Sequence, residues 1–141
     1  MLLFTGLVCV EIFLKEKALS IQLKRAYEAA SEDDGYRVLV DRLWPRGVSK
    51  QDAKIDLWLK EIAPSTELRK WFEHDPKKWD EFRERYHQEL ASHPDVVKQL
   101  ADLVKKQHVT LIYGAKNQEF NQAVALKDYE ESVRVESNCS L

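Results

Sequence analysis

Residues 38–47 read Val-Leu-Val-Asp-Arg-Leu-Trp-Pro-Arg-Gly. The apolar start of this stretch predicts a β-strand that is covered on both faces, as in a parallel sheet. One carboxylate and two guanidinium groups follow directly, and such groups are costly to bury without partners. The stretch therefore predicts either a structural ion-pair network or a ligand site at the carboxyl end of a strand, and the residues alone leave both open.

Strand patterns alternate with helical patterns along the chain. Strands are expected at residues 20–27, 36–44 and 108–113. Helices are expected at 49–62, after Pro64, after Asp75-Pro76, after Ser92 and from about Asn117 onward. This order predicts an α/β fold with a small, mostly parallel sheet of about three or four strands flanked by helices, the crossover helices lying over the sheet.

The length of 141 residues fits one domain. We expect a single domain at residues 20–133, a tail at 134–141, and an amino-terminal extension at 1–19 that is poorly ordered or packs on the domain. Residues 1–14 are apolar but too short to span a membrane, and they lack the basic start of a signal peptide. No membrane partner is expected.

Charge and cysteine content exclude several classes of protein. The formal net charge of −2 gives no global attraction to nucleic acid, although a local basic groove stays open as an alternative. Cys9 and Cys139 lie near opposite ends and form no Cys-x-x-Cys pair, so neither a disulfide framework nor a cysteine metal site is expected. No histidine spacing indicates a metal site either, and a reducing cytoplasmic location is the expectation.

Two strand ends carry the candidate site. Asp41, Arg42, Trp44 and Arg46 follow the second strand, and Gly114-Ala115-Lys116-Asn117 follows the third. Parallel strands would bring both ends to one edge, where ligands of open α/β sheets bind. Arginine holds phosphate or carboxylate groups, and the helix amino terminus after Asn117 would add N–H donors. The prediction is a small anionic ligand such as a nucleotide or sugar phosphate.

Each candidate residue has a provisional role. Asp41 is the candidate catalytic residue, as general base, metal ligand or acceptor of a ribose hydroxyl, unless it only neutralises an arginine. Arg42, Arg46 and Lys116 would hold the anion, while Asn117 and Asn121 would orient the ligand. Trp44 could stack on the ligand or pack in the core. The other three tryptophans are expected in the core, and His74 is expected to be structural.

No motif names a cofactor or a reaction. The chain has no phosphate-binding loop of the Gly-x-x-x-x-Gly-Lys-Ser/Thr type, no Gly-x-Gly-x-x-Gly fingerprint and no Gly-x-Ser-x-Gly elbow. Three functions therefore remain open: an enzyme or sensor for a small anion, a nucleic-acid-associated module with a basic and aromatic groove, and a protein-interaction module without catalysis. The sequence does not set the oligomeric state.

Three stretches together resemble the YeaO-like family, known as domain of unknown function 488. They are residues 34–47, residues 61–70 and residues 111–117, and the resemblance extends over about residues 21–132. It implies a small bacterial or archaeal cytosolic α/β domain without an established reaction. Members usually begin near the position of Ile21, so residues 1–19 would be an extra segment. The family's last helix often opens with Asn-His-Ala, where this chain has Asn121-Gln122-Ala123.

Overall fold

The computed structural model describes residues 21–139, with side chains described up to Val133. The predicted extension at 1–19 and Cys9 lie outside the described residues, as does the side chain of Cys139. The elements follow in the order β1 (Gln22–Arg25), η1 (Glu32–Asp34), β2 (Tyr36–Leu39), α2 (Lys50–Ala53), β3 (Leu57–Trp58), η2 (Lys60–Ile62), α3 (Thr66–Phe72), η3 (Pro76–Lys78), α4 (Trp79–Ala91), α5 (Pro94–Lys106), β4 (Val109–Tyr113) and α6 (Gln122–Cys139). The backbone is therefore helical at residues 134–139, where the sequence predicts a tail.

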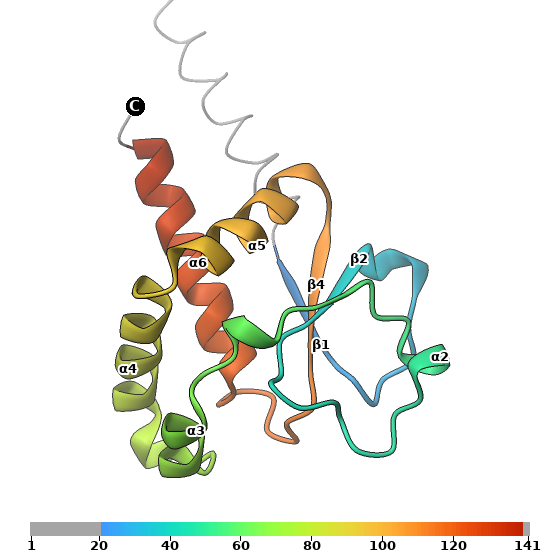
Figure 1. Cartoon of the computed structure of the whole chain (residues 1–141), viewed down its shortest axis with the longest axis horizontal. Coiled ribbons are helices and arrows are strands. Elements are labelled where there is room, and N and C mark those ends of the chain that lie inside the picture. The colour runs from blue at the N-terminus through green and yellow to red at the C-terminus, as the bar shows by residue number, and fades with distance from the viewer. Residues whose placement is uncertain (1–20, 140–141) are drawn as a thin grey trace, which may run out of the picture.

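Four parallel strands form one sheet in the order β1-β4-β2-β3 (Figure 1). The strand β4 lies between β1 and β2, with Leu111 opposite both Leu23 and Val38. All five residues of β4 are buried, as expected of a strand that is covered on both faces. This arrangement confirms the predicted α/β fold with a small parallel sheet.

The helix predicted at residues 49–62 is wrong in its second half. The helix α2 ends at Ala53, Lys54 takes a left-handed conformation with φ of 47°, and Leu57–Trp58 then pair with Val38–Leu39 as β3. The N–H of Leu59 also donates to the carbonyl oxygen of Leu39 at 2.9 Å. Pairing with β2 outweighs the helical pattern here, because apolar spacing alone does not separate a short strand from a helix.

Most of the predicted helix starts are confirmed. The hydroxyl oxygens of Ser49 and Ser65 each accept a backbone N–H of the first turn at 3.1 Å, and the carboxylate of Asp75 caps η3 in the same way at 3.0 Å. The start predicted at Ser92 is wrong, because its hydroxyl donates back to the carbonyl oxygen of Glu89 at 2.7 Å. The helix α5 instead begins with Pro94, whose fixed φ suits a first helical position.

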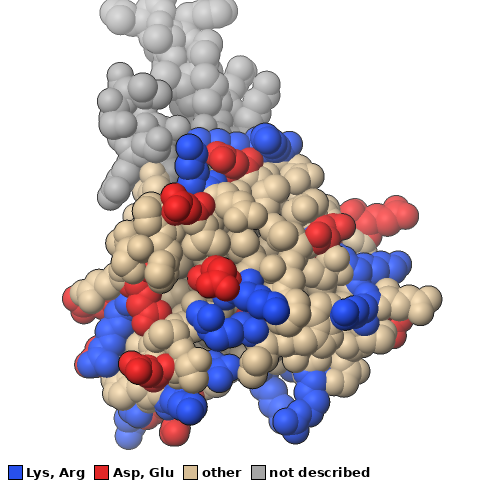
Figure 2. Space-filling model, in the orientation of Figure 1, with Lys and Arg blue, Asp and Glu red and all other residues tan. Residues whose placement is uncertain are grey.

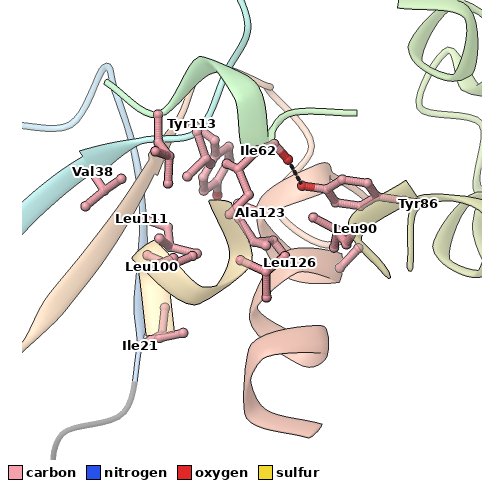
Figure 3. Close-up of a cluster of buried hydrophobic side chains, with 14 of the residues drawn as sticks. Ile21, Val38, Ile62, Tyr86, Leu90, Leu100, Leu111, Tyr113, Ala123 and Leu126 are labelled. Atoms are coloured by element: carbon pink, nitrogen blue, oxygen red, sulfur yellow. Dashed lines mark hydrogen bonds between the residues drawn. The ribbon is translucent and has the colours of Figure 1, made fainter. Parts of the chain in front are cut away.

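The two faces of the sheet are covered unequally. Helices α3 to α6 contribute to one large core, which includes the alternate strand residues Val38 and Leu111 (Figures 1 and 3). Within this core the hydroxyl of the buried Tyr86 donates to the carbonyl oxygen of Ile62 at 2.6 Å. The opposite face buries Leu39 and Ile112 in a small cluster with residues of the 44–58 segment. Alternation along β2 and β4 thus sends neighbouring side chains into two cores.

A buried ion-pair network lies at the amino end of β2. Asp34 is 5% exposed and Arg37 is 3% exposed, and the two side chains pair at 2.5 Å. Lys24 adds a second ion pair to Asp34 at 3.1 Å, and the N–H of Ser31 donates to the same carboxylate at 2.9 Å. Burial raises the pKa of Asp34, but the donors from Ser31, Lys24 and Arg37 outweigh it, so that the pKa is lowered from 3.8.

Replacement of Asp34 by alanine should therefore be strongly destabilising, because Arg37 would stay buried without an anionic partner. We expect the free energy of unfolding, measured by urea denaturation at pH 7, to fall by about 3–5 kcal/mol. Asp33→Ala, at the exposed neighbouring position, should change it by less than about 0.5 kcal/mol. Because the pKa of Asp34 is lower in the folded state, its contribution should disappear as the pH falls below 3.8. Equal losses in the two variants would contradict a stabilising role for the network.

Candidate functional site

The carboxyl ends of β2 and β4 meet at Asp41 and Gly114. The Asp41 carboxylate oxygen Oδ2 accepts the backbone N–H of Gly114 at 2.8 Å. A Cβ atom on Gly114 would lie 2.9 Å from this oxygen and 3.6 Å from the side chain of Pro45. The absence of a side chain at this position therefore lets Asp41 approach the strand end closely.

Asp41 is held by neutral donors and by three separate elements. Its oxygen Oδ1 accepts a hydrogen bond from the side-chain amide of Gln122 at the start of α6. Its backbone carbonyl oxygen accepts the indole N–H of Trp58, in β3, at 2.7 Å. Among the described residues no ion pair joins Asp41 to an arginine. The alternative in which Asp41 neutralises a neighbouring guanidinium group by direct contact is therefore not what the geometry shows.

The surroundings of Asp41 raise its pKa from 3.8 to about 6. Burial is the largest cause, because it disfavours the charged carboxylate. The hydrogen bonds from Gly114 and Gln122 and the positive charges of Arg69 and His74 act in the opposite direction but do not cancel it. Asp41 thus changes its charge close to neutral pH, in the range where functional carboxyl groups often titrate.

A cleft of about 280 Å³ opens beside Asp41. Its lining comes from Tyr27, residues 41–46, Ala63, Pro64, Arg69, His74, Gly114, Ala115 and Gln122, and we call it the Asp41 cleft. Three arginines, Arg42, Arg46 and Arg69, line it together with one acidic residue, Asp41. None of the three forms an ion pair with a described residue. The Asp41 cleft therefore carries an excess of positive charge in both protonation states of Asp41.

Arg42 is the most enclosed of these arginines. Its Nη2 donates to the carbonyl oxygen of Ala63 at 3.2 Å, which fixes the guanidinium group against the loop before α3. Its Nε is buried and has no hydrogen-bond partner among the described residues. A buried N–H without a partner costs about 1–3 kcal/mol, so a bound acceptor at this point would be favourable.

The structure brings together some of the predicted site residues and separates others. Asp41, Arg42, Trp44 and Arg46 line the Asp41 cleft. Lys116 is exposed and does not line it. The cleft lining also lacks the two asparagines Asn117 and Asn121.

Asn117 and Asn121 have backbone partners instead of facing the cleft. The side-chain oxygen of Asn117 accepts the N–H groups of Glu119 and Phe120, both at 2.9 Å. The side chain of Asn121 accepts the N–H of Val124 at 3.1 Å and donates to the carbonyl oxygen of Asn117 at 2.8 Å. The helix that the sequence predicts from about Asn117 therefore begins later, at Gln122, and these side chains accept N–H groups of the turn before it and of its first turn.

Trp44 packs in the core, which is one of the two roles that the sequence leaves open, and it also borders the cleft. Its indole N–H donates to the carbonyl oxygen of Val48 at 2.6 Å, and its ring meets Trp58 edge to face at 5.5 Å. Both rings pack against the smaller core, while Trp44 also borders the cleft. Trp71 and Trp79 pack against the large core, as predicted.

Sequence reasoning missed Arg69 and Gln122 and assigned His74 a structural role. Glu73 and His74 have φ of 50° and 57°, a left-handed pair that turns the chain sharply after α3 and costs about 1 kcal/mol or more per residue. His74 Nδ1 lies 3.1 Å from the carbonyl oxygen of Phe120. Since a carbonyl oxygen only accepts, Nδ1 donates this hydrogen bond. His74 is thus structural through one nitrogen and lines the cleft as well.

Two further features of the described residues concern metal binding and membrane insertion. Among the described residues, no three histidine, cysteine or carboxylate side chains are grouped closely enough to hold a metal ion. Within residues 21–139, no helix combines the length and the hydrophobicity that crossing a bilayer requires.

Ionisation of Asp41 should make the folded protein less stable as the pH rises. Its pKa is about 6 in the folded protein and takes the ordinary value of 3.8 in the unfolded chain, so its contribution is complete below pH 3.8 and is lost as the pH passes 6. Relative to Asp41→Asn, the wild-type free energy of unfolding should fall by about 2 kcal/mol between pH 4 and pH 7. Urea denaturation at several pH values measures this, and the same substitution at the exposed Asp52 controls for net charge. A pH-independent difference between wild type and Asp41→Asn would contradict the raised pKa.

Comparison with known proteins identifies the family. The family described as the inactive DUF488-N3 subclade matches residues 20–138. The chain is 52% identical to the uncharacterized protein YeaO of Escherichia coli (strain K12) over 115 residues, which are 82% of this chain and 100% of YeaO. It is 50% identical to the uncharacterized protein Rv3073c of Mycobacterium tuberculosis (strain ATCC 25618 / H37Rv) over 70 residues, which are 50% of this chain and 59% of that protein. No solved structure matches the chain significantly. On these matches the chain belongs to the DUF488 family, within the subclade described as inactive DUF488-N3.

Proposed function

We propose that this protein binds a small anionic ligand in the Asp41 cleft and does so without catalysing a reaction. The observation that carries the proposal is the set of three guanidinium groups that line one cleft without a carboxylate partner. At the other end of β2, by contrast, the buried Asp34 and Arg37 side chains form an ion pair. Guanidinium groups left free around a concave site are suited to phosphate or carboxylate, which they bind by paired hydrogen bonds.

Catalysis by Asp41 is disfavoured by the residue that contacts it. Gln122 donates its amide N–H to the Asp41 carboxylate, and an amide does not exchange protons near neutral pH as an imidazole does. Histidine often occupies this position in the YeaO-like family, and the chain matches the subclade described as inactive. With Gly114 on the other oxygen, Asp41 is fixed in one orientation but has no proton-carrying partner in contact. A binding or sensing role fits this arrangement better than acid–base chemistry.

The volume of the Asp41 cleft limits the size of the ligand. Its volume of about 280 Å³ lies near the lower end of the range for small-molecule sites, roughly 300–1,000 Å³. A sugar phosphate or a mononucleotide has the required charge and a comparable size. A long polyanion would need an extended basic surface, whereas Lys and Arg lie among Asp and Glu over much of the face shown in Figure 2. This interleaving supports a small ligand over a nucleic acid.

Removal of one guanidinium group should weaken anion binding without unfolding the protein. Arg69 is exposed, so Arg69→Ala should lower the affinity for sulfate or ribose 5-phosphate about tenfold while leaving the melting temperature nearly unchanged. Lys116→Ala is the matched control, because it removes an exposed positive charge near the same sheet edge but outside the cleft. Isothermal titration calorimetry measures both. Equal losses in the two variants would show a non-specific charge effect and would contradict the proposal.

Anion binding should also strengthen on acidification. Asp41 loses its negative charge as the pH falls through about 6, while the guanidinium groups of Arg42, Arg46 and Arg69 stay charged. Sulfate suits this test because its charge is constant from pH 5 to pH 8. We expect about tenfold tighter sulfate binding at pH 5 than at pH 8 in the wild type.

Two variants separate the contributions to this pH dependence. Asp41→Asn should bind sulfate at pH 8 about as tightly as the wild type does at pH 5, because it removes the charge but keeps the shape. His74→Gln should retain most of the pH dependence. The reverse result, with pH dependence lost only in His74→Gln, would show that Asp41 does not control the charge of the cleft.

A further inference from the structure

We infer that the ligand is a nucleoside monophosphate whose base lies against Tyr27 and Leu43 at the mouth of the Asp41 cleft. This inference rests on the proposed anion site and specifies what the anion is attached to. Its starting point is the position of the exposed apolar side chains. Tyr27 is 51% exposed and Leu43 is 63% exposed, and they are the large hydrophobic residues that the described part of the chain leaves exposed. Both line the Asp41 cleft.

These two residues form one rim from two separate segments. Tyr27 follows β1 and Leu43 follows β2, so they reach the cleft from different strands. The hydroxyl of Tyr27 donates to the carbonyl oxygen of Arg46 at 2.8 Å, which ties the first segment to the second. The guanidinium carbon of Arg25 lies 5.3 Å from the centre of the Tyr27 ring. The rim is thus an aromatic ring with cationic neighbours, held in place by a hydrogen bond.

The size of this rim favours a single ring system as its occupant. A stable protein interface needs about 800 Å² from each partner, and two side chains cannot supply that area. Nucleobases, by contrast, stack on aromatic rings and on guanidinium planes, and one stacked base contributes tenfold or more in affinity. The apolar rim and the arginines also belong to the same cleft, which points to one ligand with an anionic end and a planar end.

The burial of the cleft residues indicates which end of the ligand lies inside the cleft and which end lies at its mouth. Arg42 presents a buried Nε without a described partner, whereas Tyr27 and Leu43 are more than half exposed. The anionic group therefore belongs inside, near Arg42, and the base belongs at the mouth. A cavity of about 280 Å³ suits the sugar and phosphate, with the base resting on the rim.

Calorimetric titration of the full chain with AMP, ribose 5-phosphate and adenosine tests the inference. AMP should bind at least about tenfold more tightly than ribose 5-phosphate, and adenosine should bind most weakly of the three. Tyr27→Ala and Leu43→Ser should each reduce the affinity for AMP toward that of ribose 5-phosphate, while the affinity for ribose 5-phosphate itself stays unchanged. Tyr27→Phe is the matched control, because it loses the hydrogen bond to Arg46 but keeps the ring, and it should retain the preference for AMP.

The outcomes separate this inference from the proposed function. Equal affinities for AMP and ribose 5-phosphate would overturn the base-binding rim and leave the anion site standing. Absence of binding by AMP, ribose 5-phosphate and sulfate alike would overturn both. A loss of AMP preference in Tyr27→Phe as large as in Tyr27→Ala would refute stacking on the ring. Concentration-dependent self-association in sedimentation that Leu43→Ser abolishes would assign the rim to contact between copies of the chain and would also overturn the inference.

Discussion

The hydrogen bond from the Gly114 N–H to the Asp41 carboxylate determines the arrangement of the candidate site. It joins the carboxyl ends of β2 and β4, which the parallel sheet places side by side. The same aspartate accepts hydrogen bonds from Gln122 in α6 and from Trp58 in β3. Four elements therefore converge on one residue. Because backbone and amide donors hold the carboxylate, no guanidinium group is needed to fix its position, and the arginines around it stay available.

The carboxylates at the two ends of β2 have different partners and pKa shifts of opposite direction. At the amino end, Asp34 is buried with Arg37 and Lys24, and its pKa is lowered despite the burial. At the carboxyl end, Asp41 has no ionic partner among the described residues, and its pKa is raised to about 6. The first arrangement stabilises the fold by mutual neutralisation. The second leaves positive charge at an open cleft, which is an arrangement that stability alone does not favour.

The sequence predicts the sheet better than it predicts the site. Apolar runs indicated the strands around Val38 and Leu111, and the parallel order brought Asp41 and Gly114 to one edge as expected. The two-residue strand β3 was missed because Leu57 and Trp58 continue a helical spacing, and only pairing with β2 distinguishes the two structures. Arg69 was missed, and His74 was expected to be structural only, because the place of His74 in the cleft depends on the left-handed turn after α3. No local sequence pattern marks that turn, since glycine is absent from it.

The Asp41–Gln122 contact argues against proton transfer by Asp41, whereas the arginines of the cleft argue for the binding of an anion. An amide holds a carboxylate in one orientation but does not carry a proton, so the pair is a fixed structural unit. The buried Nε of Arg42 has no partner among the described residues, at a cost of about 1–3 kcal/mol. An acceptor that enters the cleft removes this cost, and an anion does so most effectively because its charge also balances Arg46 and Arg69. The unsatisfied Nε of Arg42 and the positive charge of the cleft thus both support the proposed anion site.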